Sequence, residues 1–371
     1  MLITLLILIF IRPFISSLAF PYTNSIYSTL LLSVLAIWII AKRAYLNEIK
    51  TIRYPLLLFI LALFISLIFS QHKIISMREL YKYITGLSLL LVAASLAHKE
   101  RERIIFCITA SGLLISILAI YQYFFGFQRL LGYITKQGIT EPFILDYLSR
   151  KRVFFPFVTP NSLAGYLILI MPLTLIVKDK KKWLILTILF FALLLTQSLG
   201  AFLSIFSASI IYCYLEGKFK KKGVIFLLGL FVIMGLVFMA RATTQKQHIQ
   251  PIFSTTMRLS YWKDTWGIIK AHPLLGMGLG NFNLAQSRYA HNSYLQLWAE
   301  MGILGIISIL WLIIAAFKST INNINNYPVR NQIICLLTAN ITFLIHNFVD
   351  FTFFLPEVAL IWWVLLGLIL P

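Results

Sequence analysis

Apolar residues run through this chain in long blocks, and polar residues gather in the short gaps between them. A helix needs about 20 residues to cross the hydrocarbon of a membrane, so an apolar block of about that length predicts a spanning helix. Twelve spans are predicted, at 2–20, 25–41, 54–70, 80–97, 103–124, 161–177, 183–197, 200–215, 223–240, 292–317, 331–348 and 355–370. With 60% hydrophobic residues a soluble fold is excluded. The pattern predicts an all-α integral membrane protein, folded as a single polytopic domain over residues 1–371.

The net charge is +20, and its distribution predicts the topology. Lys and Arg cluster in the short loops after each even-numbered span, as expected of cytoplasmic loops in a membrane protein, and this argues against a nucleic-acid partner. Both termini are then expected in the cytoplasm. The first block lacks the basic start of a signal peptide, and although Ser17 to Ala19 would pass as a cleavage site, we expect a membrane segment.

Two larger loops, 125–160 and 241–291, fall on the outer face in this topology, the second between helices 9 and 10. Both are basic, which the topology rule does not require; the cations are Arg129, Lys136, Arg150, Lys151 and Arg152 in the first, and Arg241, Lys246, Arg258, Lys263, Lys270 and Arg288 in the second. Any single one of these cations could instead extend its side chain to a lipid phosphate at the membrane surface. For the cluster as a whole, an anionic substrate is the preferred interpretation.

Metal chemistry and disulfides find little support in the spacing of ligand-type residues. Cys107, Cys213 and Cys335 lie apart in apolar stretches and are expected to be small core residues. His346 and Asp350 are four residues apart and can meet on one helical face. No third ligand is close in sequence, so we expect a hydrogen-bonded pair at the outer membrane edge and no metal site.

Several ordered motifs carry a family resemblance. Arg258 precedes a segment with Trp262 and Trp266, and is followed by HPLLGMGLGNF at 272–282 and AHNSYLQLWAEMGILG at 290–305. Two further matches are FPFVTPNSLAGYL at 155–167 and HNFVDFTFFLP at 346–356. The chain thereby resembles the O-antigen ligase and polymerase superfamily of bacterial envelope proteins over roughly its carboxy-terminal sixty per cent.

The resemblance implies a glycosyltransferase in the bacterial cytoplasmic (inner) membrane. It would take a glycan from a polyprenyl-diphosphate carrier at the outer face and pass it to a hydroxyl of a glycolipid or glycan acceptor, without a cofactor. The matching site positions are Arg258 for the diphosphate and His291 of the HN pair, with Asn292 beside it. Ligases commonly carry Ser-Arg-Gly where this chain has Leu199 in QSLG. Candidates to replace that arginine are Arg152, Lys151 and Arg241, and Arg288 is a further tentative residue for binding the diphosphate.

The chemistry of these side chains fits the same roles. A guanidinium binds a diphosphate through two parallel N–H groups and stabilises the leaving group without a metal. Imidazole titrates near neutrality and can take the proton of an acceptor hydroxyl, which is worth about 10² to 10⁴ in rate. Arg258 and His291 are therefore predicted as the catalytic residues. An interfacial histidine without this motif would more often be a structural residue.

Two further features lie close to His291. Glu300, nine residues later, falls on the opposite face of one continuous helix, the face of Ser293 and Gln296, and must find a partner or a wet cavity in the membrane; its role is open between structure and function. Gly276, Gly278 and Gly280 lack the strand and helix of a dinucleotide site. They predict a tight turn whose N–H groups face phosphate.

Three functions remain open. A ligase needs one cationic site for one lipid diphosphate, whereas a polymerase holds two such carriers; the match around His291 favours the ligase, and charge counting does not decide. A flippase for lipid-linked oligosaccharides would place charges along several spanning helices. Almost all charges of this chain lie in loops, which favours the enzyme.

Overall fold

The computed structural model describes residues 1–41, 49–138, 148, 150–177, 179–217, 221–244, 253–325 and 329–370, and these form helices and turns with no strand among them. The helices are α1 (Leu2–Ile11), α2 (Pro21–Ala41), α4 (Arg53–Ile68), α5 (Lys73–Ala94), α6 (His98–Tyr121), α7 (Phe127–Gln137), α9 (Pro160–Thr174), α10 (Lys181–Thr196), α11 (Leu199–Leu215), α12 (Lys221–Thr244), α13 (Phe253–Ala271), α14 (Ser293–Asn322), α15 (Arg330–His346) and α16 (Pro356–Leu368). Short helical turns are η1 (Arg12–Phe14), η2 (Gln122–Gly126) and η4 (Thr352–Phe354).

Eleven of the predicted spans coincide with a helix, and the all-helical fold is confirmed; the span predicted at 2–20 is wrong as a single helix, because α1 covers only its first half. Three helical stretches among the described residues are long and apolar enough to cross a membrane: Pro21–Ala41, His98–Ile134 and Ser293–Asn322. The other helices are either shorter or do not combine that length with enough apolar residues, and a count of twelve crossings stays a prediction. The first block is interrupted as its sequence suggests, since α1 ends at Ile11 and Arg12 and Pro13 begin a 3-10 turn.

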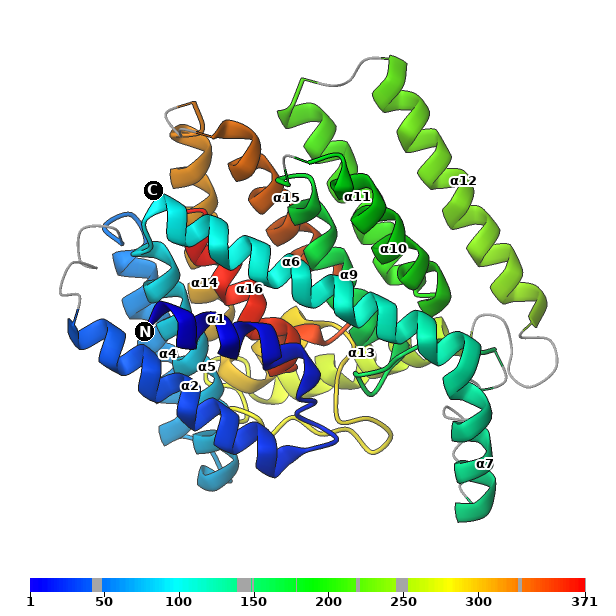
Figure 1. Cartoon of the computed structure of the whole chain (residues 1–371). Helices are drawn as coiled ribbons and strands as arrows, with labels where there is room; N and C mark the ends of the chain where they lie inside the picture. Colours follow the sequence, from blue (N-terminus) through cyan, green and yellow to red (C-terminus); the bar gives the residue numbers. More distant parts are fainter. Residues whose placement is uncertain are drawn as a thin grey trace.

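Helix α16 forms the centre of the bundle (Figure 1). Every residue from Pro356 to Leu368 is buried, and a helix that is apolar on all sides is stable only inside a protein or a membrane. Its neighbour α5 approaches closely because Gly86 leaves room for the ring of Trp363, whose Cδ1 lies 2.4 Å from where a Cβ of residue 86 would be. By contrast α12 packs on α11, and most of its large side chains are exposed.

One end of the bundle carries the polar segments. Helix α13 lies across this end in Figure 1, within the loop 241–291 that the sequence predicts; residues 245–252 of that loop lie outside the described part. The loop that follows α13 and the turn between α15 and α16 are at the same end, because α14 and α16 both begin there. We refer to it as the α13 end.

Helix α14 is broken at Gly302, which has φ 67° and ψ −169°. The loop after α13 enters the break: the N–H of Ile303 donates to the carbonyl oxygen of Pro273 at 3.0 Å. A Cβ at residue 302 would lie 2.0 Å from the carbonyl oxygen of Leu274. Glycine is therefore required here both for its positive φ and for the close approach of the loop.

Gly302→Ala is expected to destabilise the protein by more than about 1 kcal/mol, because alanine is strained at a positive φ and clashes with the loop. Thermal unfolding of the purified protein in detergent measures the effect. The matched control is Gly235→Ala in α12, where no atom lies within 4 Å of the new Cβ. Equal unfolding temperatures of the two variants would contradict the role given to the break.

Candidate functional site

His291 lies at the α13 end, two residues before α14 begins at Ser293. The sequence prediction that His291 and Glu300 share one continuous helix is therefore wrong. Its backbone is left-handed, with φ 52°, which is uncommon for any residue but glycine. The ring stacks on Tyr261 of α13 at a centroid distance of 5.7 Å and meets the edge of Phe351 at 4.8 Å. Two aromatic rings from different segments thus fix the imidazole.

Asn292 explains why α14 begins where it does. Its side-chain oxygen accepts from the N–H groups of Tyr294 at 3.0 Å and Leu295 at 3.1 Å, two of the donors that a helix start leaves unpaired. The N–H of Ser293 donates to the carbonyl oxygen of Asn347 at 2.9 Å, and its hydroxyl donates to the Asn347 side chain at 2.7 Å. The start of α14 is thereby held against the turn after α15.

Arg258 reaches the same place from α13. Its Nη2 lies 3.8 Å from Oδ2 of Asp350, whose side chain is 2% exposed while that of Arg258 is 22% exposed. The other carboxylate oxygen of Asp350 accepts from the N–H of Phe351 at 2.8 Å. Trp262, one turn after Arg258, donates from its ring to the carbonyl oxygen of His291 at 3.4 Å. The guanidinium is held loosely by one carboxylate and keeps an accessible side.

The electrostatics favour a neutral imidazole at His291. Burial lowers its pKa to about 4; the negative charge of Asp350 opposes this shift, and the positive charge of Arg258 adds to it. The Nδ1 atom is buried and has no hydrogen-bond partner among the described residues. At neutral pH the ring is therefore uncharged, and its lowered pKa makes it a weaker proton acceptor than a free imidazole.

Glu300 connects the glycine turn to the residue before His291. It is 1% exposed, and its carboxylate accepts from the Nε2 of Gln296 at 2.9 Å and from the N–H of Gly280 at 2.8 Å. Gln296 in turn accepts from the N–H of Ala290 at 3.1 Å. The predicted shared face of Glu300 and Gln296 is confirmed, and the contacts support a structural role for Glu300.

The glycine turn is present, with positive φ at Gly276, Gly278 and Gly280. Its amides do not face a phosphate site, and that prediction is wrong. The N–H of Gly278 donates to the carbonyl oxygen of Glu300 at 3.0 Å, that of Gly276 to His272, and that of Gly280 to the Glu300 carboxylate. The turn is a packing element, bound to α14 just before its break.

His346 and Asp350 do not form the predicted hydrogen-bonded pair, because α15 ends at His346 and Asp350 faces Arg258. His346 is 1% exposed, and neither ring nitrogen has a hydrogen-bond partner in the described structure. The ring fits where Gly165 of α9 leaves room, since its Cε1 lies 3.1 Å from a Cβ built at residue 165. Within the described parts of the chain no three His, Cys, Asp or Glu side chains group as metal ligands.

The tentative diphosphate residues have different environments. Arg152 is 3% exposed and donates to the carbonyl oxygen of Thr196 at 2.9 Å and to Asn161 at 3.1 Å, so it braces α10 against α9. Lys151 lies over the ring of Tyr123 at 5.9 Å, and Arg288 is exposed. The side chain of Arg241 lies outside the described part. A role of these four in substrate binding stays a prediction.

Sequence reasoning missed the two rings that hold His291. Tyr261 lies three residues after Arg258, on the same side of α13, and this spacing could have indicated it. Phe351 follows Asp350 directly and belongs to a turn that no periodic pattern describes. Its contact with His291 joins residues that are sixty positions apart, and only the fold shows it.

These features define a membrane protein of apolar helices in which Arg258, His291 and Asp350 lie together at one end of the bundle. Residues 184–310 match the family model of the O-antigen ligases, a stretch that runs from α10 into α14 and includes Arg258, His291 and Glu300. This match supports the resemblance to the O-antigen ligase superfamily over about a third of the chain, and that family in general implies glycosyltransferase-like enzymes with glycan and lipid-linked substrates. No curated protein matches the chain.

Proposed function

We propose that this protein is a glycosyltransferase of the O-antigen ligase type. It transfers a glycan from a polyprenyl-diphosphate carrier to a hydroxyl of lipid A-core or a similar glycolipid, at the outer face of the bacterial cytoplasmic membrane. The observation that supports this most is the meeting of Arg258 and Asp350 with the neutral His291 at the α13 end. A cation and a base in one place are what transfer from a diphosphate requires.

In this mechanism the acceptor hydroxyl oxygen attacks the anomeric carbon of the donor glycan. The carbon–oxygen bond to the diphosphate breaks, and its electron pair leaves with the phosphate oxygen. Arg258 stabilises that developing charge through paired N–H groups, and His291 takes the hydroxyl proton. Because Asp350 holds Arg258 at 3.8 Å, an arriving diphosphate can compete for the guanidinium while Asp350 keeps it oriented. A side chain supplies the positive charge, so the reaction is proposed to be independent of metals.

His291→Ala is expected to lower transfer by about 10² to 10⁴-fold, since it removes the proton acceptor. The assay uses purified protein, lipid-diphosphate glycan and acceptor lipid, with and without excess chelator. The matched control is His272→Ala, an exposed histidine of the same loop, which should retain wild-type turnover. If the His291 variant keeps wild-type turnover, His291 is not the base. If the wild-type protein loses activity in chelator and regains it when one divalent ion is added, the metal-free mechanism is wrong.

The alternative is a polysaccharide polymerase of the same superfamily. A polymerase holds two chains on diphosphate carriers and would use a second cationic site. Leu199 begins α11 at the position where the ligases commonly carry an arginine, and Arg152 is engaged in bracing α10, so the count of cations does not decide between the two enzymes. The sequence match around His291 is what favours the ligase. A transporter of lipid-linked glycans is less well supported, because the described cations gather at helix ends.

Deleting the gene in its host separates the two enzymes. For a ligase we expect full-length glycan to accumulate on the carrier lipid, with none on the terminal acceptor, when lipids are extracted and profiled by mass spectrometry. Complementation with the intact gene is the control. Accumulation of single repeat units on the carrier would instead identify a polymerase.

A further inference from the structure

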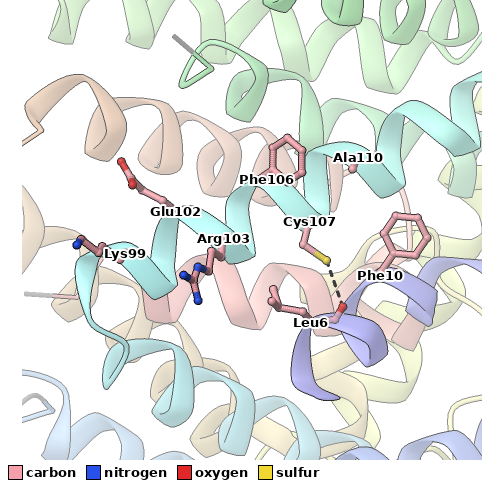
Figure 2. A pocket seen from close by; sticks show the side chains of 8 residues that line it. All are labelled: Leu6, Phe10, Lys99, Glu102, Arg103, Phe106, Cys107 and Ala110. Carbon is pink, nitrogen blue, oxygen red and sulfur yellow. Dashed lines mark hydrogen bonds between the residues drawn. The ribbon is translucent and has the colours of Figure 1, made fainter. Parts of the chain in front are cut away.

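A groove lies between α1 and α6, away from the site just described (Figure 2). Its volume is about 670 Å³, within the range of small-molecule sites. Lys99 and Arg103 lie at its polar end, and Leu6, Phe10 and Phe106 provide apolar walls. The groove combines cations with apolar surface, as an amphiphilic ligand requires.

The polar end of the groove is at the opposite end of the bundle from α13. Arg101, between the two cations of the groove, donates to the carbonyl oxygens of Leu368 at 3.0 Å and Leu370 at 2.8 Å, where α16 finishes. Helix α16 begins at the α13 end, so these carbonyls mark the other end. A ligand of this groove therefore lies in the membrane leaflet remote from the proposed transfer site.

The two cations share one face of α6, since they are four residues apart. Both side chains are exposed, and neither forms a hydrogen bond or an ion pair with any other residue in the described part of the chain. Figure 2 shows Arg103 on the side of α6 that faces α1, and Glu102 lines the groove as well. Two cations against one carboxylate leave the lining with a net positive charge toward a ligand head group.

The length of the groove fits one leaflet. From Lys99 to Ala110 a helix rises about 16 Å, and half of the hydrocarbon thickness of a bilayer is about 15 Å. Leu6 and Phe10 follow the same direction along α1, and the Sγ of Cys107 closes the floor by donating to the carbonyl oxygen of Leu6 at 3.1 Å. An acyl chain fills such a surface, and a longer spanning helix of a partner does not match its length or its charged end.

We propose that this groove binds an anionic phospholipid of the leaflet opposite the α13 end. Lys99 and Arg103 bind the head-group phosphate, and one acyl chain lies against Leu6, Phe10 and Phe106. Basic surfaces between membrane helices favour anionic lipids by about fivefold in affinity per cation. Binding here does not involve Arg258 or His291, so it is independent of the proposed transfer reaction.

The test is native mass spectrometry of the purified full chain, titrated with phosphatidylglycerol or with phosphatidylcholine. The intact protein should retain phosphatidylglycerol in preference, and Lys99→Gln with Arg103→Gln should weaken that binding about tenfold or more. The matched control, Lys180→Gln with Lys181→Gln, removes two exposed cations near the start of α10 and should leave the affinity unchanged.

A second variant tests the apolar part of the groove. Ala110→Trp fills it while both cations remain, and should lower retention of phosphatidylglycerol by a similar factor. Three results would each overturn the proposal. The intact protein could retain both lipids equally, the two charge variants could lose equal affinity for phosphatidylglycerol, or the Ala110 variant could bind it as well as the intact protein. Because no glycan donor is present, failure here leaves the transfer mechanism untouched.

Discussion

A carboxylate buried among apolar helices is stable only if protein groups replace its water, and Glu300 imposes this requirement on the whole α13 end. Its two oxygens accept from Gly280 and Gln296, and its backbone carbonyl accepts from Gly278 and from the hydroxyl of Ser66 in α4. The loop after α13 is thereby bound to α14 at several points. This loop enters the break at Gly302, so the polar segment and the helix fold as one unit.

The site follows from that attachment. Gln296, held by Glu300, accepts from the residue before His291, and Asn292 then begins the helix. His291 is left in a left-handed conformation between Tyr261 and Phe351, outside the helix and beside the ion pair of Arg258 and Asp350. Three segments far apart in sequence contribute, and no two of them make the site alone. Strain at His291 is maintained by the surrounding contacts, as is common at functional positions.

The helices could be predicted because apolar blocks of helical length indicate burial, and every block after the interrupted first one coincides with a helix. The family resemblance of the surrounding motifs indicated Arg258 and His291, since an interfacial histidine by itself would more often be structural, and their catalytic roles stay a prediction. What failed depended on contacts between segments. The amides of Gly278 and Gly280 were expected to face phosphate but donate to Glu300, and His346 was expected to bond Asp350, which faces Arg258 instead. Sequence spacing does not show which of several donors a buried acceptor will take.

The central claim is that the donor diphosphate binds between Arg258 and His291. A cryo-EM structure of the full chain in a lipid nanodisc, with polyprenyl diphosphate bound, tests it most directly. The account predicts phosphate density within hydrogen-bond distance of the Arg258 guanidinium and next to the imidazole, with Asp350 still beside Arg258. Density bound instead at Arg152 and Lys151, with Arg258 in contact only with Asp350, would contradict it.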